Sequence, residues 1–485
     1  MFIGIDLGTS SVKCVLVDEN ERVIATASEA LVVSRPAPTH SEQNPASWWT
    51  ATVTALDHLA HDAPAAMAAV RGIGLSGHMH GATLLDAQDR VLRPCILWND
   101  GRAATECAEM EAMWPALRSV TGNIAMPGFT APKLLWIRKQ EPAIFAATAK
   151  VLLPKAYLRL LLTGEYVEDM SDAAGTLWLD VGKRDWSDAA LAATGLAREH
   201  MPRLVEGSQP AGRLRQELAQ RWGMTSAPVF AGGAGDNAAG AISLGAVRPG
   251  DAFVSLGTSG VLWATTAGFA PNPAEAVHAF CHCIPETWHQ MGVILSAASC
   301  LSWLSTTLGA SEADLLAGMG DKVARPSNLL FLPYLSGERT PHNDPQIRGA
   351  FIGLSHETDR AALVQSVMEG VAFALSDCLT ALRAAGTRIS AADVIGGGAR
   401  SALWLSILAN VLDLPLSQIT GAEVSGAFGA ARLGRLAATG EDPLTVCRPP
   451  QRAATVEPDP ALRDGYAIAY ARYRKAYPNL KAIAL

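Results

Sequence analysis

The sequence predicts an α/β protein built from two similar domains, and three observations support this. Residues 7–12 (LGTSSV) return almost unchanged as residues 256–261 (LGTSGV), about half a chain length further on. Runs rich in β-branched residues alternate with helical patterns in both halves of the chain. The length of 485 residues suits two or three domains of roughly 150 residues each.

Each copy of the repeat predicts a β-hairpin with a tight glycine turn. The strands expected around the two turns are 2–5 with 12–17, and 252–255 with 261–264. Further strands are predicted at 72–75, 229–231 and 394–395, and helices at 46–59, 361–384, 401–412 and, as a polar tail, 460–477. Pro249 and Gly250 interrupt a helical pattern, so we place the domains at 1–245 and 246–485.

Composition and charge exclude several classes of protein. Hydrophobic residues make up 49% and charged residues 18%, which is typical of a globular chain and not of a disordered one. The net charge of -7, with scattered basic residues, argues against a nucleic-acid partner. Asp6 interrupts the first apolar run, and the apolar stretch 293–304 is shorter than the roughly 20 residues of a membrane span. We expect a cytoplasmic protein without a membrane partner.

The first turn has the residue types of a phosphate and metal site. The Asp6 carboxylate ends a strand, and Gly8, Thr9, Ser10 and Lys13 follow it with an open backbone, hydroxyls and a cation. One such copy alone is equally well explained as a plain hairpin turn. The second copy, with Gly257 and Thr258, favours a polyphosphate held from both sides of a cleft. Because Ser255 replaces the aspartate there, the metal carboxylate is assigned to the first domain.

A third glycine-rich segment, 396–398, lies between an apolar strand and a helix. Its backbone is open to the close approach of a ligand at a helix N-terminus. The spacing matches neither the dinucleotide-binding fingerprint nor the P-loop. An ordinary strand-to-helix turn is the alternative, and only the two hairpins favour a ligand role.

The segment 230–240 (FAGGAGDNAAG) places Asp236 after small residues at the start of a helix. Small neighbours leave room for a substrate, and the carboxylate could take a proton from a hydroxyl that attacks a γ-phosphoryl group. A helix N-cap is the structural alternative, and the two roles are compatible.

Two polar loops and one cluster complete the candidates. The loops 76–81 and 98–102 each follow an apolar strand and could line a pocket for a polyol, although solvated loops have the same composition. His278, Cys281, His282, Cys283 and His289 could bind a metal but lack the paired ligand spacing of zinc sites. We interpret them as residues that alternate along a strand.

With these segments the chain resembles the FGGY carbohydrate kinases, in the superfamily of hexokinase, actin and the seventy-kilodalton heat-shock proteins. Residues 128–137 resemble the first family signature, and 349–354 with 367–370 resemble the second. The resemblance covers nearly the whole chain. It implies two duplicated ribonuclease H-like domains of the actin/hexokinase type, a catalytic cleft between them that closes on substrate, and ATP and Mg²⁺ as cofactors.

Within the family, residues 78–82, 92–102, 170–175 and 335–341 resemble the xylulokinase group. This implies a small-molecule sugar substrate and transfer of the ATP γ-phosphoryl group to the C5 hydroxyl of D-xylulose, with a homodimer as the expected assembly. A kinase for another ketose or polyol, such as ribulose, a hexulose or erythritol, is one alternative. A non-catalytic nucleotide-dependent sensor or chaperone is the other, and the presence of both Asp6 and Asp236 argues against it.

The resemblance also implies roles for individual residues. Asp236 is the general base, and Asp6 organises Mg²⁺ through water, with Asp236 also facing the metal. The residues implied for the sugar are Met79, His80, Trp98, Asp236 and Asn237. Those implied for the nucleotide are Thr9, Ser10, Lys13, Gly257 and Thr258 at the phosphates and Ala298, Ser302, Gly397, Gly398 and Ser401 near the adenosine.

Overall fold

The computed structural model describes residues 1–419 and 425–483 and contains two large sheets. In spatial order, the first sheet consists of β13 (Pro210–Arg213), β14 (Val229–Ala231), β5 (Gly72–Gly77), β1 (Phe2–Leu7), β2 (Ser11–Val17) and β3 (Val23–Ala30), and β15 (Ala234–Gly235) also pairs with β5. The second consists of β18 (His278–Cys281), β19 (Trp288–Ile294), β17 (Gly260–Thr266), β16 (Ala252–Leu256), β22 (Ala392–Ile395), β23 (Leu416–Ile419) and β24 (Arg452–Val456).

The two sheets share one topology. In the first, the antiparallel hairpin β1–β2 continues into antiparallel β3, and β1 pairs on its other side with parallel β5 and then parallel β14. In the second, the hairpin β16–β17 continues into antiparallel β19, and β16 pairs with parallel β22 and then parallel β23. The predicted duplicated α/β fold is therefore confirmed.

Alternation along β1 separates the two faces of the first sheet. Ile3 and Ile5 pack with α1 (Pro45–Asp62), whereas Phe2 packs with α16 (Gly426–Thr439). Asp6 has the parity of Phe2, so it lies on the α16 face. The other helices that pack on the sheets or on these helices are α7 (Pro154–Thr163) and α11 (Asp236–Ser243) in the first half and α12 (Ala298–Leu308), α14 (Arg360–Ala384), α15 (Ala402–Leu412) and α18 (Arg463–Ile483) in the second.

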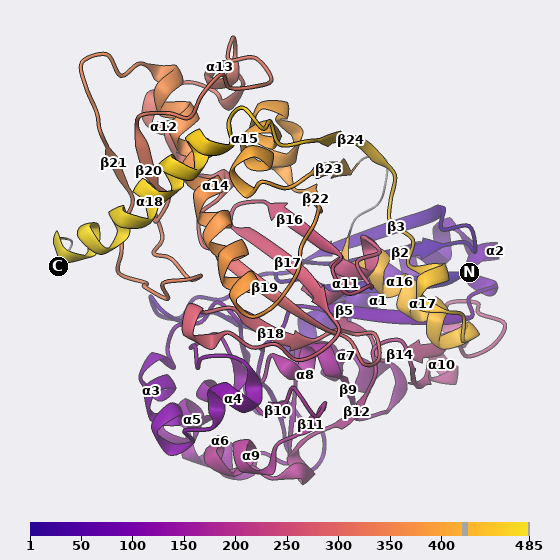
Figure 1. Cartoon of the computed structure of the whole chain (residues 1–485). Coiled ribbons are helices and arrows are strands. Elements are labelled where there is room, and N and C mark those ends of the chain that lie inside the picture. Colours follow the sequence, from indigo (N-terminus) through magenta and orange to yellow (C-terminus); the bar gives the residue numbers. More distant parts are fainter. Residues whose placement is uncertain (420–424, 484–485) are drawn as a thin grey trace.

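Helix α16 belongs to the second half of the chain but packs on the first sheet. Figure 1 shows this helix, in yellow-orange, among the indigo strands of the first half. Three glycines of the first sheet allow the contact: a Cβ at Gly4 would lie 1.7 Å from the Ala427 carbonyl oxygen, one at Gly74 would lie 1.9 Å from that of Ala430, and one at Gly72 would lie 2.1 Å from that of Gly434. Nothing in the sequence pattern indicates this crossing. The domain boundary at residue 245 stays a prediction.

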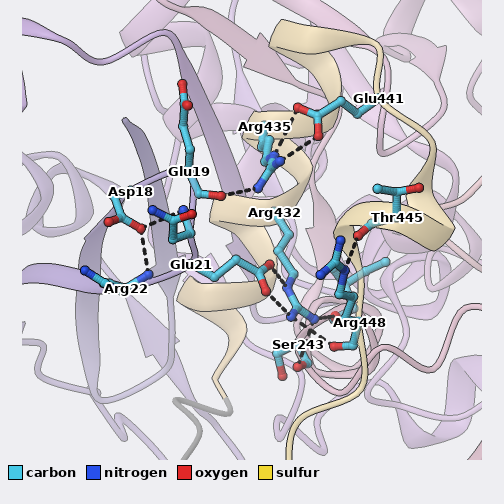
Figure 2. A network of polar contacts seen from close by, with 12 residues as sticks. Asp18, Glu19, Glu21, Arg22, Ser243, Arg432, Arg435, Glu441, Thr445 and Arg448 are labelled. Atoms are coloured by element: carbon cyan, nitrogen blue, oxygen red, sulfur yellow. Dashed lines mark hydrogen bonds and ion pairs between the residues drawn. The ribbon is translucent and has the colours of Figure 1, made fainter.

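Arg432 of α16 ties together the segments that connect the two halves (Figure 2). Its guanidinium pairs with both Glu21 carboxylate oxygens at 2.7 and 2.9 Å, and it donates to the carbonyl oxygens of Ile242, Ser243 and Arg448 at 2.8, 3.2 and 3.0 Å. It thereby satisfies carbonyls at the C-terminal end of α11, which the helix leaves without partners. The C-terminal end of α11 is fixed to the middle of α16 beside the β2–β3 turn.

Helix α14 is the one helix in residues 1–419 and 425–483 that is long and apolar enough to span a membrane, and 83% of that apolar stretch is buried. Its side chains belong to the hydrophobic core of the second half, with those of α12 and α15. We therefore assign α14 to the core. Between β5 and β14, an insertion carries α3 (Ala104–Met113), α5 (Thr130–Gln140), α8 (Met170–Ala174) and α9 (Asp188–Thr194).

Candidate active site

The two candidate catalytic aspartates lie at one edge of the first sheet. Asp6 is the penultimate residue of β1 and is in register with Ser76 of parallel β5. Asp236 directly follows β15, whose Gly235 is in register with Gly77 of β5. The carboxyl ends of parallel strands are where α/β sheets bind ligands. The structure thus brings together the two carboxylates that the sequence predicted.

Asp6 carries a carboxyl oxygen without a partner. Burial raises the pKa of Asp6, and the nearby Ser76 hydroxyl and Lys13 ammonium lower it by less. Asp6 Oδ1 and Ser76 Oγ are both buried without a hydrogen bond, so the hydroxyl is close but outside hydrogen-bond geometry. Gly426, the first residue of α16, lies against this carboxyl, so the partial positive charge of the helix N-terminus adjoins it. An orphaned carboxylate oxygen fits a hydrated divalent cation.

Asp236 is held by its neighbour. The Asn237 amide N–H and side-chain Nδ2 both donate to Asp236 Oδ1, at 2.7 and 2.8 Å. Asp236 keeps solvent access at this edge of the sheet. Desolvation by the protein around the carboxyl, followed by the negative charge of Asp6, raises the pKa of Asp236 to about 6. Because Asn237 occupies only Oδ1, Oδ2 is left to accept a proton.

Met79 is buried and His80 is partly exposed, on the loop after β5. His80 Nδ1 lies 2.6 Å from the Gly175 carbonyl oxygen, and a carbonyl can only accept, so Nδ1 carries the proton. Burial, with help from the Lys133 charge, lowers the pKa of His80 to about 3, and the ring is neutral at pH 7. Its Nε2 is therefore a hydrogen-bond acceptor, which suits a hydroxyl donor.

His80 lines a cavity of about 570 Å³ to which both halves of the chain contribute. From the first half come His80, Trp98, Asn99, Asp100, Cys107 and Phe129, and from the second come His278, Leu295, Glu338, Arg339 and Asn343. The mixture of hydrogen-bonding groups and flat apolar side chains suits a small polyol. The polar loops predicted from the sequence form one wall of this cavity.

The second wall contains residues that sequence reasoning did not single out. Glu338 Oε1 accepts from the backbone N–H groups of Leu295 and Arg339 at 3.0 and 2.7 Å, whereas Oε2 is buried without a partner. Burial raises the pKa of Glu338 to about 8, so this carboxyl can donate at neutral pH. Arg339 Nη1 lies 3.4 Å from His278 Nε2. The sequence signal for these two residues is that they form an adjacent pair of opposite charges. The segment 335–341 contributed only to the family resemblance and not to the predicted site.

His278 is the member of the His/Cys cluster that lines the cavity. His278 and Cys281 begin and end β18, and His289 lies in β19. His282 and Cys283, beyond β18, are buried. Within residues 1–419 and 425–483, these five side chains form no group with metal-ligand geometry.

The two hairpin turns are held by contacts from other elements. Trp98 Nε1 donates to Thr9 Oγ1 at 3.0 Å, and Gln43 Nε2 donates to the Thr9 carbonyl oxygen at 2.7 Å. At the second turn, the Ala298 N–H donates to the Gly257 carbonyl and the Ala297 N–H to that of Thr258, both at 2.8 Å. Ala298 thus supports the second turn from the start of α12. Trp98 joins the cavity to the first turn.

The remaining predicted nucleotide residues lie in both halves of the chain. Gly397 is exposed, with open space where a Cβ would be, whereas Gly398 is buried against Leu256. Ser401 caps α15 by accepting from the Trp404 N–H, and Ser302 donates to Glu312 at 2.5 Å. Ser10 is exposed at the first turn, and Lys13 is in register with Asp6 across the hairpin. Their contacts with a nucleotide stay predictions.

A second acidic group, Glu168, Asp169 and Asp172, is fully buried beneath the Asp236 loop. Its oxygens are close enough together to ligate a metal, but Lys155 pairs with all three carboxylates. Buried carboxylates need a positive charge beside them, and the Lys155 ammonium already supplies it. A divalent cation therefore fits the Asp6 edge better than this cluster.

Comparison with known proteins decides the family. Residues 1–243 match the N-terminal domain, and residues 252–438 the C-terminal domain, of the FGGY family of carbohydrate kinases. The chain is an FGGY carbohydrate kinase. The kinase is 53% identical to a xylulose kinase of Escherichia coli (strain K12), over 92% of this chain and 91% of that one. It is 36% identical to a xylulose kinase of Bacillus subtilis (strain 168), over 99% and 97% of the two chains.

Solved structures agree with this assignment. A protein described as a xyloylose kinase from Brucella ovis superimposes on the kinase with a TM-score of 0.98 at 57% identity, covering 99% of each chain. A xylulose kinase from Rhodospirillum rubrum superimposes with a TM-score of 0.92 at 29% identity, covering 100% of this chain and 99% of that one. The predicted family and the predicted two-domain actin/hexokinase-type fold are confirmed.

Proposed function

We propose that this kinase transfers the γ-phosphoryl group of ATP to the C5 hydroxyl of D-xylulose, giving D-xylulose 5-phosphate and ADP. The observation that carries the proposal is the 53% identity to the Escherichia coli xylulose kinase over 92% of the chain. The site supports it, because a base with a raised pKa lies at the same sheet edge as the loop that carries His80, and His80 lines a polar cavity large enough for a pentulose.

Asp236 acts as the general base in this reaction. Its Oδ2 takes the proton from the C5 hydroxyl as the hydroxyl oxygen attacks the γ-phosphorus, and the bond from that phosphorus to the β-γ bridging oxygen breaks to release ADP. Asn237 fixes the rotation of the Asp236 side chain through its two bonds to Oδ1. His80 Nε2 accepts a hydrogen bond from a second sugar hydroxyl and orients the substrate.

Asp6 and Asp236 would hold Mg²⁺ through water, and the cation would neutralise charge on the phosphates. Thr9 can donate its hydroxyl proton to a phosphate oxygen, because Trp98 already supplies the bond that Thr9 Oγ1 accepts. We further propose Ser10, Lys13, Gly257 and Thr258 as phosphate contacts. Ala298, Ser302, Gly397, Gly398 and Ser401 are proposed to border the adenosine.

Substrate identity is tested by ADP release from the purified protein with Mg-ATP. We expect strong stimulation by D-xylulose and at least about tenfold lower kcat/KM for D-ribulose, L-ribulose and glycerol, the size of effect that one well-placed polar contact produces. Higher kcat/KM for another of these compounds would reassign the sugar pocket and keep the kinase chemistry. No stimulation by any of them would favour a sensor.

The raised pKa of Asp236 predicts the acid side of the pH profile. A general base must be ionised, so kcat/KM should fall about tenfold per pH unit below the pKa of about 6. An ordinary aspartate would keep its activity to about pH 4. The measurement is kcat/KM for the sugar between about pH 4.5 and pH 8 at constant ionic strength. A profile that stays flat down to about pH 4.5 would contradict the assignment.

Other expectations from the sequence stay predictions. They are the homodimer, the cytoplasmic location, and the absence of nucleic-acid and membrane partners.

A further inference from the structure

The short helix α8 contacts both the catalytic aspartate's loop and the sugar-binding histidine. It begins after Asp169 and ends at Gly175, and residues 169 and 171–175 are buried. None of these residues was predicted to touch a ligand.

The first end of α8 holds the residue before Asp236. Ser171 Oγ donates to Asp169 Oδ2 at 2.5 Å, and the Gly235 N–H donates to Ser171 Oγ at 3.1 Å. Because the hydroxyl has one proton and gives it to Asp169, it can only accept from Gly235. The carboxylate of Asp169 therefore fixes the rotor of Ser171, and Ser171 fixes the backbone next to Asp236.

The other end of α8 holds the sugar-binding dipeptide. The Gly175 carbonyl oxygen accepts from His80 Nδ1 at 2.6 Å. A Cβ at Gly175 would lie 2.7 Å from the His80 ring and 2.8 Å from the Met79 methyl group. His80 can keep this position only because residue 175 has no side chain.

Buried charges anchor α8 to α7. Lys155 Nζ pairs with Asp169 Oδ1 at 2.8 Å and also with Glu168 and Asp172. One helical turn further along α7, Arg159 donates to the carbonyl oxygens of Ala231 and Gly232, at the start of the segment that leads from β14 to Asp236. Lys155, Arg159 and the three carboxylates are at most 1% exposed. Breaking such buried pairs is costly, which makes the anchor rigid.

We propose that α8 with Asp169 and Gly175, anchored through Lys155, is a positioning element that holds Asp236 and His80 at a fixed separation. A sugar that binds His80 then presents its reacting hydroxyl to Asp236. A displacement of about 1 Å at a reacting group can cost about a hundredfold in rate. The rate gained by holding Asp236 and His80 in place can therefore offset the free-energy cost of burying these charges. The inference rests on the proposed function, because it assigns Asp236 and His80 the roles given above.

Two substitutions test the two ends of α8 separately. Ser171→Ala removes the acceptor for the Gly235 N–H, and we expect kcat to fall about 10- to 100-fold with the KM for ATP unchanged. Gly175→Ala fits the backbone conformation there but displaces His80, so the KM for D-xylulose should rise about tenfold or more.

Ser187→Ala is the matched control. Ser187 caps α9 by accepting from the Ala190 N–H, in the same insertion, and contacts neither Asp236 nor His80. We expect it to change none of the three readouts. Parental kcat in Ser171→Ala, or a parental KM for D-xylulose in Gly175→Ala, would overturn the proposal. If Ser171→Ala does not fold, Gly175→Ala decides alone. An unmodified protein that does not phosphorylate D-xylulose would overturn the proposed function instead.

Discussion

Asp236→Asn should lower kcat for sugar phosphorylation by about 10²- to 10⁴-fold, the usual contribution of a general base. The substitution keeps the Oδ1 acceptor for Asn237, so the loop geometry should persist. The KM for ATP should stay within about twofold of the parent. Initial rates of ADP release at saturating D-xylulose, together with nucleotide binding by calorimetry, measure the two effects.

Asp413→Asn is the control for this experiment. Asp413 is an exposed residue at the end of α15 that pairs with Arg463, and its left-handed backbone also suits asparagine. It should leave kcat unchanged. Turnover of Asp236→Asn within about tenfold of the parent, a barrier change of roughly 1.4 kcal/mol, would show that Asp236 is not the base.

Gly4→Ala should strongly destabilise the protein. The new methyl group would lie 1.7 Å from the Ala427 carbonyl oxygen and 2.5 Å from the Ala431 nitrogen, both backbone atoms of α16 that cannot rotate away. We expect a loss of at least about 3 kcal/mol, at the upper end of overpacking effects. Activity should fall as well, because α16 begins beside Asp6. Thermal unfolding followed by circular dichroism measures the effect.

Gly240→Ala provides the matched control. Gly240 lies inside α11, and no atom is within 4 Å of the position where its Cβ would be. Replacing a helical glycine with alanine should stabilise the protein by about 0.5–1 kcal/mol. Equal unfolding temperatures for Gly4→Ala and the parent would mean that α16 does not lie against β1 as described.

The sequence was sufficient for features that local patterns determine. The repeated Gly-Thr-Ser turns predicted two equivalent hairpins, because a strand, a glycine turn and a second strand are read within about a dozen residues. Asp236 was found in the same way, from small residues before a helix start. The predicted strands, each of the two carboxylates taken separately and the helical tail all have this local origin.

Features that depend on distant contacts were not predictable. Gly4 and Gly74 look like ordinary strand residues until α16, some 350 to 420 positions later, is placed on them. A role for Glu338 and Arg339 can be recognised only in the folded protein, where the second half forms a wall of the cavity. Ser171 could not be linked to the catalytic aspartate, because its hydrogen bond is to Gly235, the preceding residue, 64 positions along the chain. Single-sequence patterns do not contain such pairings.

The placement of α16 on the first sheet has a consequence for synthesis of the protein. Domains generally fold as units while they emerge from the ribosome, with the N-terminal domain first. Here the first sheet emerges early, but one of its faces is covered by a helix that is translated near the end of the chain. In the nascent first half, Phe2, Val15 and Val17 therefore lack their contacts with α16 until residues 426–439 leave the exit tunnel. We therefore expect the first sheet to complete its packing late in synthesis, and a ribosome that stalls before this helix to leave an unfinished sheet for chaperones to protect.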